Sequence, residues 1–431
     1  MVFDTSSRIK GDNDVKLKRK VKKFFLLDEE YGLCKRTVLS NVVNRESMRI
    51  GLLTYGMKDR LTGIGRYAMQ LSYGVRSIAP DMEIVLLNPY PESLLPWYKD
   101  FPVISVPLLR RLPAVMSIGP FLLDHLAKRY SLDLVHDPCG IAPFLPTKRP
   151  HKVVTIHDAI PLKYPGLYPW LGRMLFRTQI PWSKWTAQQI ITVSISAKDD
   201  LTKCARIPQE LITVIYPGVD IPSDESLGIL RWGPVPSDLD QQLVDSPYFL
   251  YVGAINPRKN IERIIEAMTV LCEEYPRLRL LVVGPNSLPP SGRDIVKYLG
   301  YVDQKTLDFL YVHALAVLVP SLYEGFGFPA LEAMGRKSVA IVSNVSSLPE
   351  VTGDGAIQID PYDTMVWVKA MAAVMNDIRY REAVALRGYE IAKTFSWEKT
   401  ARQTADLYRQ VTGQGRIRRG GTFRDTTANI D

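Results

Sequence analysis

The 431-residue sequence has little cysteine, no long apolar run and no patterned group of metal ligands. Its four cysteines are dispersed, without a C-x-x-C pair or a nearby histidine cluster, which argues against a disulfide framework and a zinc site. The longest apolar stretches, 280–283 and 314–319, are far shorter than the roughly 20 residues of a membrane-spanning helix. The apolar run 24–27 is too short for a signal peptide, and acidic residues follow it. We therefore expect a cytoplasmic protein with reduced thiols.

Positive charge gathers at both ends of the chain, whose net charge is +9. Residues 16–23 hold six cations, and Arg416, Arg418 and Arg419 crowd the other end. Such clusters bind nucleic acid or anionic lipid, or are solvated tails. Because no zinc-finger or RNP-type motif accompanies them, we expect no nucleic-acid partner. Two alternatives stay open: peripheral binding to an anionic surface at the inner face of the cell membrane, and no specific partner.

A change in composition near Met48 separates the two parts of the sequence. Residues 1–47 show no convincing alternation, whereas Met48 begins a run typical of a buried strand. We predict that residues 1–47 are a basic extension, either disordered or the result of a start codon assigned too early.

From residue 48 onward, short β-branched runs alternate with helix-period segments. Strands are predicted at 49–55, 84–88, 132–136, 152–156, 190–193 and 213–216, and then at 248–253, 279–284, 315–320, 339–343 and 356–359. This alternation predicts parallel sheets covered on both faces. A linker rich in Pro, Gly, Ser and Asp, at 217–247, separates the two halves. The sequence therefore predicts two doubly wound domains, with ligands at the carboxyl ends of the strands.

The most specific pattern is Ser-Leu-Tyr-Glu-Gly-Phe-Gly-Phe-Pro-Ala-Leu-Glu at 321–332, which follows a predicted strand and opens a helix. Gly325 and Gly327 allow a ligand to approach backbone amides near the helix amino terminus. Glu324 in the loop and Glu332 in the helix reach different parts of one ligand. The pattern favours a site for anions and hydroxyl groups, and the alternative is a strand–turn–helix junction with two surface glutamates.

A second pattern follows the predicted strand that ends at Gly253. Arg258 and Lys259 directly precede a helix that Asn260 can cap. Two fixed cations beside a helix amino terminus suit a diphosphate group on electrostatic grounds. A solvated basic turn is the alternative.

Gly63 and Gly65 belong to the segment Thr-Gly-Ile-Gly-Arg-Tyr, between the first strand and a helix. With Ala68 they match G-x-G-x-x-A, a variant of the dinucleotide fingerprint that would indicate an NAD-dependent oxidoreductase. Gly63 lies too far beyond the strand for the tight first turn, and Asn88 stands where an acid should hold the ribose. A flexible glycine loop over a ligand cleft fits better.

His136 and His157, each followed by Asp, stand at predicted strand ends. A side chain there faces the ligand crevice, so either histidine could contact substrate, and a purely structural role is the alternative for both. No Ser or Cys nucleophile elbow is present. Asp-x-Asp occurs only at 12–14 and 238–240, neither after a strand, so a metal-bound nucleotide is poorly supported.

Taken together, these segments resemble the retaining GT-B glycosyltransferases of family 4. The E-x₇-E spacing of Glu324 and Glu332 and the upstream P-R-K-N segment occur in that family's order, and the likeness covers about 48–411. It includes the segments G-I-G-R-Y, T-I-H-D, V-S-I-S-A-K and Y-P-G-V-D. The segment 396–408 is similar to the terminal helix that crosses back to the first domain. Residues 1–47 and the Arg-rich end depart from the family pattern.

The resemblance implies transfer of a sugar from a nucleotide-diphosphate donor to an acceptor hydroxyl, with retention of anomeric configuration. Arg258 and Lys259 would hold the diphosphate and stabilise the leaving phosphate. Glu332 would accept the ribose hydroxyls, while Glu324 would contact the donor sugar. His157 would meet the sugar hydroxyls or the reaction centre from the other domain. These cations and the helix dipoles would replace a divalent metal, so no cofactor or metal is expected.

The resemblance also implies a set of donor-binding residues in loops and at strand ends, namely Gly63, Gly65, Gly253, Gly325, Phe326 and Gly327. Phe326 and Gly327 would offer backbone amides near the donor sugar. Gly63 and Gly65 would approach the phosphates or the acceptor.

The predicted fold is therefore α/β and GT-B, with two doubly wound Rossmann-like domains facing a cleft. Its parts are an extension at 1–47, an acceptor-side domain at 48–230, a nucleotide-sugar domain at 231–395, a crossing helix at 396–412 and a basic tail at 413–431. The segments G-I-G-R-Y and H-D-A-I-P-L resemble mannosyl- or rhamnosyl-type members that build polysaccharide or glycolipid on sugar or lipid-linked acceptors. The alternatives are a catalytically inactive nucleotide-sugar-binding module, expected to lack Glu324 or Arg258, and the oxidoreductase.

Overall fold

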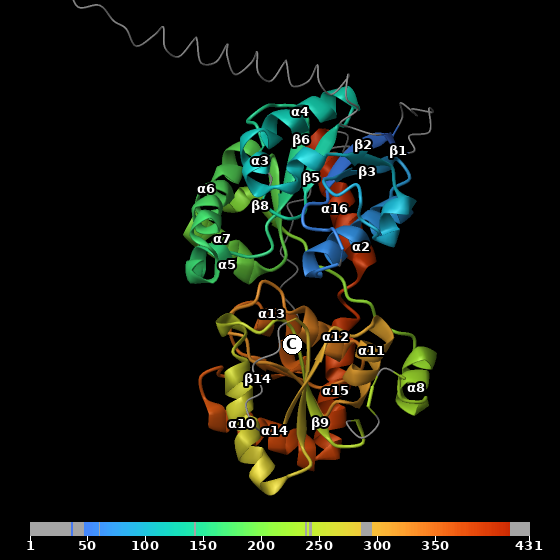
Figure 1. Ribbon diagram of the computed structural model, residues 1–431, viewed down its shortest axis with the longest axis vertical. Coiled ribbons are helices and arrows are strands. Elements are labelled where there is room, and N and C mark those ends of the chain that lie inside the picture. The colour runs from blue at the N-terminus through green and yellow to red at the C-terminus, as the bar shows by residue number, and fades with distance from the viewer. Residues whose placement is uncertain are drawn as a thin grey trace, which may run out of the picture.

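The structure, a computed structural model, describes residues 36–37, 47–59, 61–141, 144–237, 239–240, 244–285 and 295–413 (Figure 1). The described chain forms two α/β domains, each built on its own sheet, and Figure 1 shows one above the other. The predicted α/β class with two doubly wound domains is confirmed. The cationic segment 16–23 and the three terminal arginines lie outside the described residues.

The first sheet has eight strands in the order β1-β4-β3-β2-β5-β6-β7-β8, and all pairings are parallel except that of β1 with β4. The strands are β1 (Arg36–Thr37), β2 (Met48–Leu53), β3 (Met82–Asn88), β4 (Val103–Ser105), β5 (Leu134–Asp137), β6 (His151–Thr155), β7 (Gln189–Thr192) and β8 (Ile212–Val214). β1 lies inside the predicted amino-terminal extension, so two of its residues form an edge strand that the sequence did not indicate.

Helices cover both faces of the first sheet, as its alternating apolar side chains require. Leu53 of β2 packs into one core cluster, whereas Ile50 and Leu52 pack into the other. The helices of this domain are α2 (Gly63–Ile78), α3 (Leu112–Ser117), α4 (Gly119–Arg129), α5 (Ile160–Lys163), α6 (Trp170–Thr186) and α7 (Ile195–Ala205). Side chains of α2 contribute to the Ile50 cluster, and those of α4 and α7 to the Leu53 cluster.

The second sheet has six parallel strands in the order β11-β10-β9-β12-β13-β14. They are β9 (Tyr248–Val252), β10 (Arg279–Val283), β11 (Val296–Gly300), β12 (Val317–Val319), β13 (Ala340–Ser343) and β14 (Ile357–Ile359). The helices are α10 (Ile261–Glu274), α11 (Gln304–His313), α12 (Phe328–Met334), α13 (Leu348–Thr352), α14 (Thr364–Asn376) and α15 (Ile378–Ala392). None of the described helices combines the length and the apolar composition that crossing a bilayer requires.

Each of the eleven predicted strands is present, with both ends within two residues of the prediction. The sequence missed β1, β4 and β11, which lie at or next to the sheet edges. β1 and β4 have only two and three residues, and only one of the five residues of β11 is buried, so none of them shows the continuous apolar run of the central strands.

The linker predicted at 217–247 contains a helix, α8 (Asp224–Trp232). The Ser223 side chain caps its first turn. Lys337 of the second domain forms a 2.7 Å ion pair with Asp224, so α8 lies against the second domain. The turn-forming composition of the segment concealed this helix.

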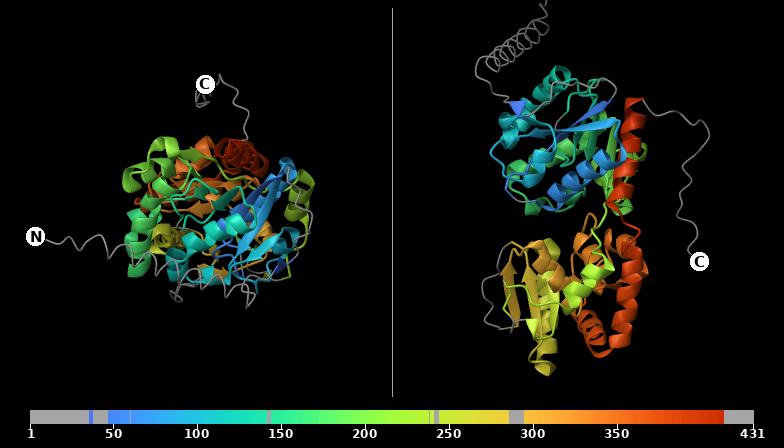
Figure 2. Two further views of the ribbon diagram at one scale, coloured as in Figure 1. Left: turned by 90° about the horizontal axis from the view of Figure 1, so that it is seen from above. Right: turned by 90° about the vertical axis from the view of Figure 1, so that its right-hand side faces the viewer.

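The last described helix, α16 (Trp397–Thr412), leaves the second domain and packs on α2 of the first (Figure 2). A Cβ at Gly74 of α2 would lie 2.6 Å from the Cβ of Ala401, so only glycine permits this approach. Near the other end, Arg409 forms a 2.9 Å ion pair with Asp81. The predicted crossing helix is confirmed.

Strand order reverses once within each sheet, between β2 and β5 in the first and between β9 and β12 in the second. Crevices at such reversals, at the carboxyl ends of the strands, are where open α/β sheets bind ligands. β9 leads into Gly253, Arg258 and Lys259, and β12 leads into the segment 321–332. The fold therefore brings the two strongest sequence patterns to one place.

Candidate active site

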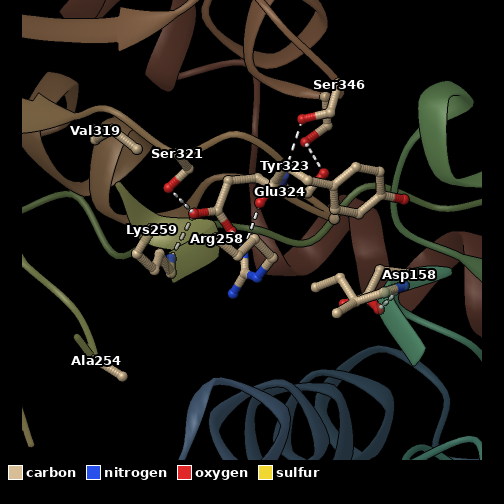
Figure 3. A network of polar contacts seen from close by, with 12 residues as sticks. Asp158, Ala254, Arg258, Lys259, Val319, Ser321, Tyr323, Glu324 and Ser346 are labelled. Atoms are coloured by element: carbon tan, nitrogen blue, oxygen red, sulfur yellow. Dashed lines mark hydrogen bonds and ion pairs between the residues drawn. The ribbon is translucent and has the colours of Figure 1, made fainter. Parts of the chain in front are cut away.

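Glu324 is the centre of a charged cluster after β12 (Figure 3). One carboxylate oxygen, Oε1, accepts hydrogen bonds from Lys259 Nζ at 2.5 Å and Ser321 Oγ at 2.6 Å. The other, Oε2, lies 3.2 Å from Arg258 Nη1. Burial acts to raise the pKa of Glu324, but the charges of Lys259 and Arg258 outweigh it and hold the pKa below its ordinary value. The Glu324 carboxyl is therefore ionised at neutral pH.

The backbone around Glu324 is held from two sides. Its amide donates to Ser346 Oγ at 2.9 Å, and Ser347 Oγ donates to its carbonyl at 2.9 Å. Arg258 Nη1 also donates to the carbonyl of Tyr323. Two cations and one carboxylate leave this cluster with a net charge of about +1, which favours an anionic ligand.

Arg258 and Lys259 lie in a short 3₁₀ helix, Pro257–Lys259, that the Asn256 side chain caps by accepting the Lys259 amide at 3.3 Å. Asn260 has a left-handed φ of 54° and occupies the cap position of α10 without a capping hydrogen bond. Its Nδ2 instead donates to the carbonyls of Pro320 and Pro361, at 3.1 and 2.9 Å. The prediction that its side chain caps the helix is wrong, because that amide ties three loops together.

Gly325 is the point at which the 321–332 segment meets the first domain. A Cβ at this position would lie 2.7 Å from the carbonyl oxygen of His157 and 2.9 Å from Asp158 Cβ. Ser194 Oγ of the first domain donates to the Gly325 carbonyl at 2.7 Å. Any side chain at this position would have to push the two domains apart.

Asp158 is a site residue to which sequence reasoning gave no role. Burial raises its pKa to about 6, although the Ile160 amide and Arg258 act to lower it. Asp158 and Glu324 therefore have pKa values shifted in opposite directions within one charged site, a pattern common in catalytic centres. The signal available in the sequence was its place directly after His157 at a strand end.

His157 is neutral, because burial lowers its pKa to about 4. Its Nε2 lies 2.8 Å from the carbonyl of Pro138, which can only accept, so Nε2 carries the proton and Nδ1 is the acceptor. The ring packs edge-on against Tyr67 of α2, with centroids 5.0 Å apart. His157 thus lies beside Gly325 but is not a general acid at neutral pH.

His136 is fully buried and has a structural environment. Its ring nitrogens lie 2.5 Å from Tyr408 OH and 2.8 Å from Thr155 Oγ1. Burial lowers its pKa to about 3. These contacts anchor the crossing helix α16 and favour the structural alternative for this residue.

Glu332 is 9% exposed and has partners on both domains. Its Oε1 forms a 2.7 Å ion pair with Arg66 of α2, and its Oε2 accepts a hydrogen bond from Tyr311 OH at 2.8 Å. Arg66 also donates to Gln304 of α11 at 3.1 Å. Sequence reasoning missed the contributions of Arg66 and Tyr311, and only the position of Arg66 next to Gly65 could have signalled the first.

Gly63 and Gly65 lie in the first turn of α2, which Thr62 caps by accepting the Gly65 amide at 3.3 Å. The expectation of a flexible glycine loop is therefore corrected: the loop ends at Thr62. A Cβ at Gly65 would approach Leu61 to 3.1 Å, whereas one at Gly63 would meet nothing.

The three other predicted donor-binding residues occupy turns with different constraints. Gly253 follows β9 with a φ of 152°, and its amide donates to the Val283 carbonyl at 2.9 Å. Gly327 has a φ of 106° and caps α12. Phe326 is buried, with its ring 5.1 Å from that of Phe328. Among the described residues, no group of three or more His, Cys, Asp or Glu is arranged to hold a metal ion.

Family models match both domains of the chain. The model for Glycosyltransferase Family 4 matches residues 61–222, and the model for Glycosyl transferases group 1 matches residues 240–390. The chain belongs to the family 4 glycosyltransferases. The glycosyltransferase predicted from the motifs is confirmed, and the oxidoreductase alternative is wrong.

Individual related proteins resemble this glycosyltransferase over most of its length. It is 29% identical over 395 residues to the O-antigen chain mannosyltransferase B of Escherichia coli, covering 84% of this chain and 100% of that protein. A sucrose-phosphate synthase from Thermosynechococcus elongatus superimposes with a TM-score of 0.65 and 19% identity, covering 85% of this chain and 100% of that one. Anabaena HepE, solved with UDP and glucose, superimposes with a TM-score of 0.62 and 17% identity, covering 84% and 100%. The predicted GT-B fold is confirmed.

Proposed function

We propose that this glycosyltransferase moves a sugar from a nucleotide-diphosphate donor to an acceptor hydroxyl with retention of anomeric configuration. The observation that carries the proposal is the pair of cations, Arg258 and Lys259, held by Glu324 at the strand-order reversal of the second domain. The net positive charge of this cluster and its place at the end of β9 suit a donor diphosphate.

The reaction breaks the bond between the anomeric carbon and the diphosphate oxygen, and that oxygen keeps the electron pair. The acceptor oxygen bonds to the anomeric carbon from the same face, and its proton passes to the departing phosphate oxygen. In this proposal Arg258 and Lys259 stabilise the growing phosphate charge. Glu324 is ionised and can stabilise positive charge at the anomeric carbon. His157 can accept a sugar hydroxyl at Nδ1.

Glu332 would hold the ribose hydroxyls in this proposal. In the present arrangement Arg66 and Tyr311 each bond one of its carboxylate oxygens. A ribose must therefore share Oε1 with Arg66 or replace it. In this proposal Arg66 lies beside the nucleotide rather than beside the reacting carbon.

We further propose that the product belongs to a surface polysaccharide or glycolipid and that the sugar is mannose or a related hexose such as rhamnose. Support comes from the relative that is an O-antigen chain mannosyltransferase. No divalent metal is required in this proposal, because Arg258, Lys259 and the nearby helix terminus supply the positive charge that a metal would otherwise provide.

The experiment has two stages. A thermal-shift series with GDP, UDP, ADP and dTDP identifies the base, since only a bound nucleotide stabilises the fold. The matching nucleotide sugars are then incubated with mannose- and rhamnose-containing oligosaccharides, and released nucleotide and product anomer are measured. Stabilisation by a nucleotide with no release from any donor would favour the inactive-module alternative. Product of inverted configuration, or complete loss of activity in EDTA, would refute the retaining and the metal-independent parts respectively.

A further inference from the structure

Helix α6 lies on the outer side of the first domain (Figure 1), and it presents apolar side chains to solvent. Large side chains on it have exposed fractions that a packed surface helix rarely shows, namely Trp170 at 66%, Leu171 at 44%, Met174 at 59%, Trp182 at 44% and Trp185 at 60%. We call these five residues the α6 face. At helical spacing they fall within one arc of about 120°, so they lie on one side of the helix.

The opposite side of α6 packs into the core of the first domain. Ile180 is 3% exposed and belongs to a core cluster of the first domain, and Phe176 packs against the same cluster. The side chain of Ser183 is buried beside them. Because this inner side fixes the helix in place, the outer apolar side chains are not required for packing, and their exposure needs another explanation.

All charged residues of α6 have one sign. Arg173, Arg177 and Lys184 lie along one margin of its arc, and the chain has no Asp or Glu between Asp158 and Asp199. Arg173 and Arg177 are exposed, and neither forms an ion pair with any residue that the structure describes. A cationic margin without carboxylates complements an anionic surface.

The shape of this region favours a lipid surface over a protein partner. Protein interfaces concentrate their tryptophans in pockets that the partner fills, whereas the α6 face is the convex outside of a helix. Tryptophans stand at the first residue of α6 and in its last turn, about 22 Å apart along the helix, so a helix lying flat would insert both ends equally. Indole rings and adjacent cations are what the headgroup region of a bilayer accepts.

We propose that the α6 face binds the surface of a membrane containing anionic phospholipid. α5 begins two residues after Asp158, and Lys163 of α5 lies over the Tyr323 ring at 4.7 Å. A membrane bound at α6 would therefore lie close to the cleft in which the proposed function places the acceptor. The lipid contact itself does not depend on the donor or the acceptor.

Tryptophan fluorescence tests this proposal directly, because residues 1–47 contain no tryptophan and cannot contribute to the signal. The full chain is mixed, without nucleotide, with vesicles of brominated phosphatidylcholine alone or with added phosphatidylglycerol. Bromine quenches only rings that enter the acyl region. Three of the seven tryptophans are on α6, so we expect anionic vesicles to remove up to roughly 40% of the emission.

Two variants identify the surface. The variant Arg173→Gln, Arg177→Gln, Lys184→Gln keeps all tryptophans and should bind anionic vesicles roughly a hundredfold more weakly. Trp232→Phe removes a tryptophan that is 85% exposed on α8 and should leave the absolute loss of emission on bromine quenching unchanged. Circular dichroism and the unfolding temperature confirm that both variants are folded.

Absence of quenching by anionic vesicles would overturn the proposal, and so would equal quenching by neutral ones. Sedimentation with vesicles but without quenching would assign binding to another surface, such as the basic segment 16–23. Self-association that Trp185→Ser abolishes, in the absence of quenching, would instead identify α6 as an interface between copies of this chain.

Discussion

The 321–332 segment holds two glutamates whose exposure is nearly equal, 8% for Glu324 and 9% for Glu332. Their hydrogen-bond and ion-pair partners differ. Glu324 bonds cations and a hydroxyl of its own domain, whereas Glu332 bonds a cation of the other domain. Burial therefore does not distinguish them. The Glu324 end can form without the first domain, but the Glu332 end depends on how the domains meet.

In the proposed function, this difference separates two kinds of contribution to catalysis. A fixed cluster of Arg258, Lys259 and Glu324 is suited to charge that changes during the reaction. The pair of Glu332 and Arg66, which joins two domains, is suited to binding a part of the donor that does not react. Substitutions at the two ends should therefore change different kinetic constants.

Arg258→Ala should have the largest effect. In the proposed reaction the leaving diphosphate gains charge in the transition state, and removal of one fixed donor to such a charge costs about 3–4 kcal/mol, or roughly a hundred- to a thousandfold in kcat. Steady-state kinetics on the cognate donor measure the loss. Arg277→Ala, at an exposed position between α10 and β10, is the matched control and should retain wild-type kcat. A kcat within a few-fold of wild type in Arg258→Ala would remove it from the catalytic centre.

Glu324→Gln should follow, with kcat reduced by about ten- to a hundredfold and little change in nucleotide affinity. The amide keeps the shape of the side chain but cannot stabilise positive charge on the sugar. It also leaves Arg258 and Lys259 without their anion, so the unfolding temperature should fall. Kinetics, nucleotide titration and thermal unfolding measure the three quantities. Unchanged kcat together with weaker nucleotide binding would mean that Glu324 binds the donor before the reaction and does not stabilise the transition state.

The sequence predicted the local parts of this site well, because they depend on short-range chemistry. Glycine at 325 and 327, and Arg258 beside Lys259 after a strand, have direct conformational or electrostatic consequences. The sequence could not predict the Arg66 contact to Glu332 or the Gly325 contact to Asp158, since both depend on the placement of one domain against the other. The prediction for Asn260 was wrong for a related reason: its position at the cap was correct, but its side chain donates hydrogen bonds to loops distant in sequence.

Asp158→Asn tests the raised pKa of Asp158, which is opposite in direction to the shift of Glu324. The native pKa of about 6 lies above the ordinary value of 3.8, so between these values the folded protein holds a proton that the unfolded chain releases. The free energy of unfolding should therefore fall as pH rises from about 4 to 6, and the loss should persist above pH 6. Asparagine does not ionise and therefore avoids this loss of stability. We expect the free energy of unfolding of the variant to be about 1–3 kcal/mol higher than that of the wild type at pH 7.

Denaturant unfolding of wild type and Asp158→Asn across this pH range measures the effect. The difference in stability between the two proteins should be near zero at pH 4 and reach its full value above pH 6. A difference that does not vary with pH would mean that the pKa of Asp158 is the same in the folded protein and in the unfolded chain.

Glu332→Ala should act on the donor KM and leave kcat nearly unchanged, because ribose hydroxyls do not change during the reaction. Loss of charged hydrogen bonds of this kind costs about 1–3 kcal/mol, or roughly a fivefold to a hundredfold rise in KM. Glu382→Ala, an exposed glutamate on α15, is the control. A loss confined to kcat would place Glu332 at the reacting carbon and abolish the contrast between the two glutamates.

Arg66→Met should have the smallest effect, but the direction in which it changes the donor KM is informative. The Arg66 side chain is 35% exposed, and ion pairs of this kind contribute roughly 0–1 kcal/mol, which limits any change to about fivefold. If a donor ribose replaces Arg66 on Glu332 Oε1, removing the guanidinium lowers the donor KM while kcat stays constant. Arg66→Lys preserves a cation that competes for Oε1 and should resemble wild type. A raised KM in Arg66→Met would show instead that Arg66 itself contacts the nucleotide, and that the contact between the domains is part of the donor site rather than its competitor.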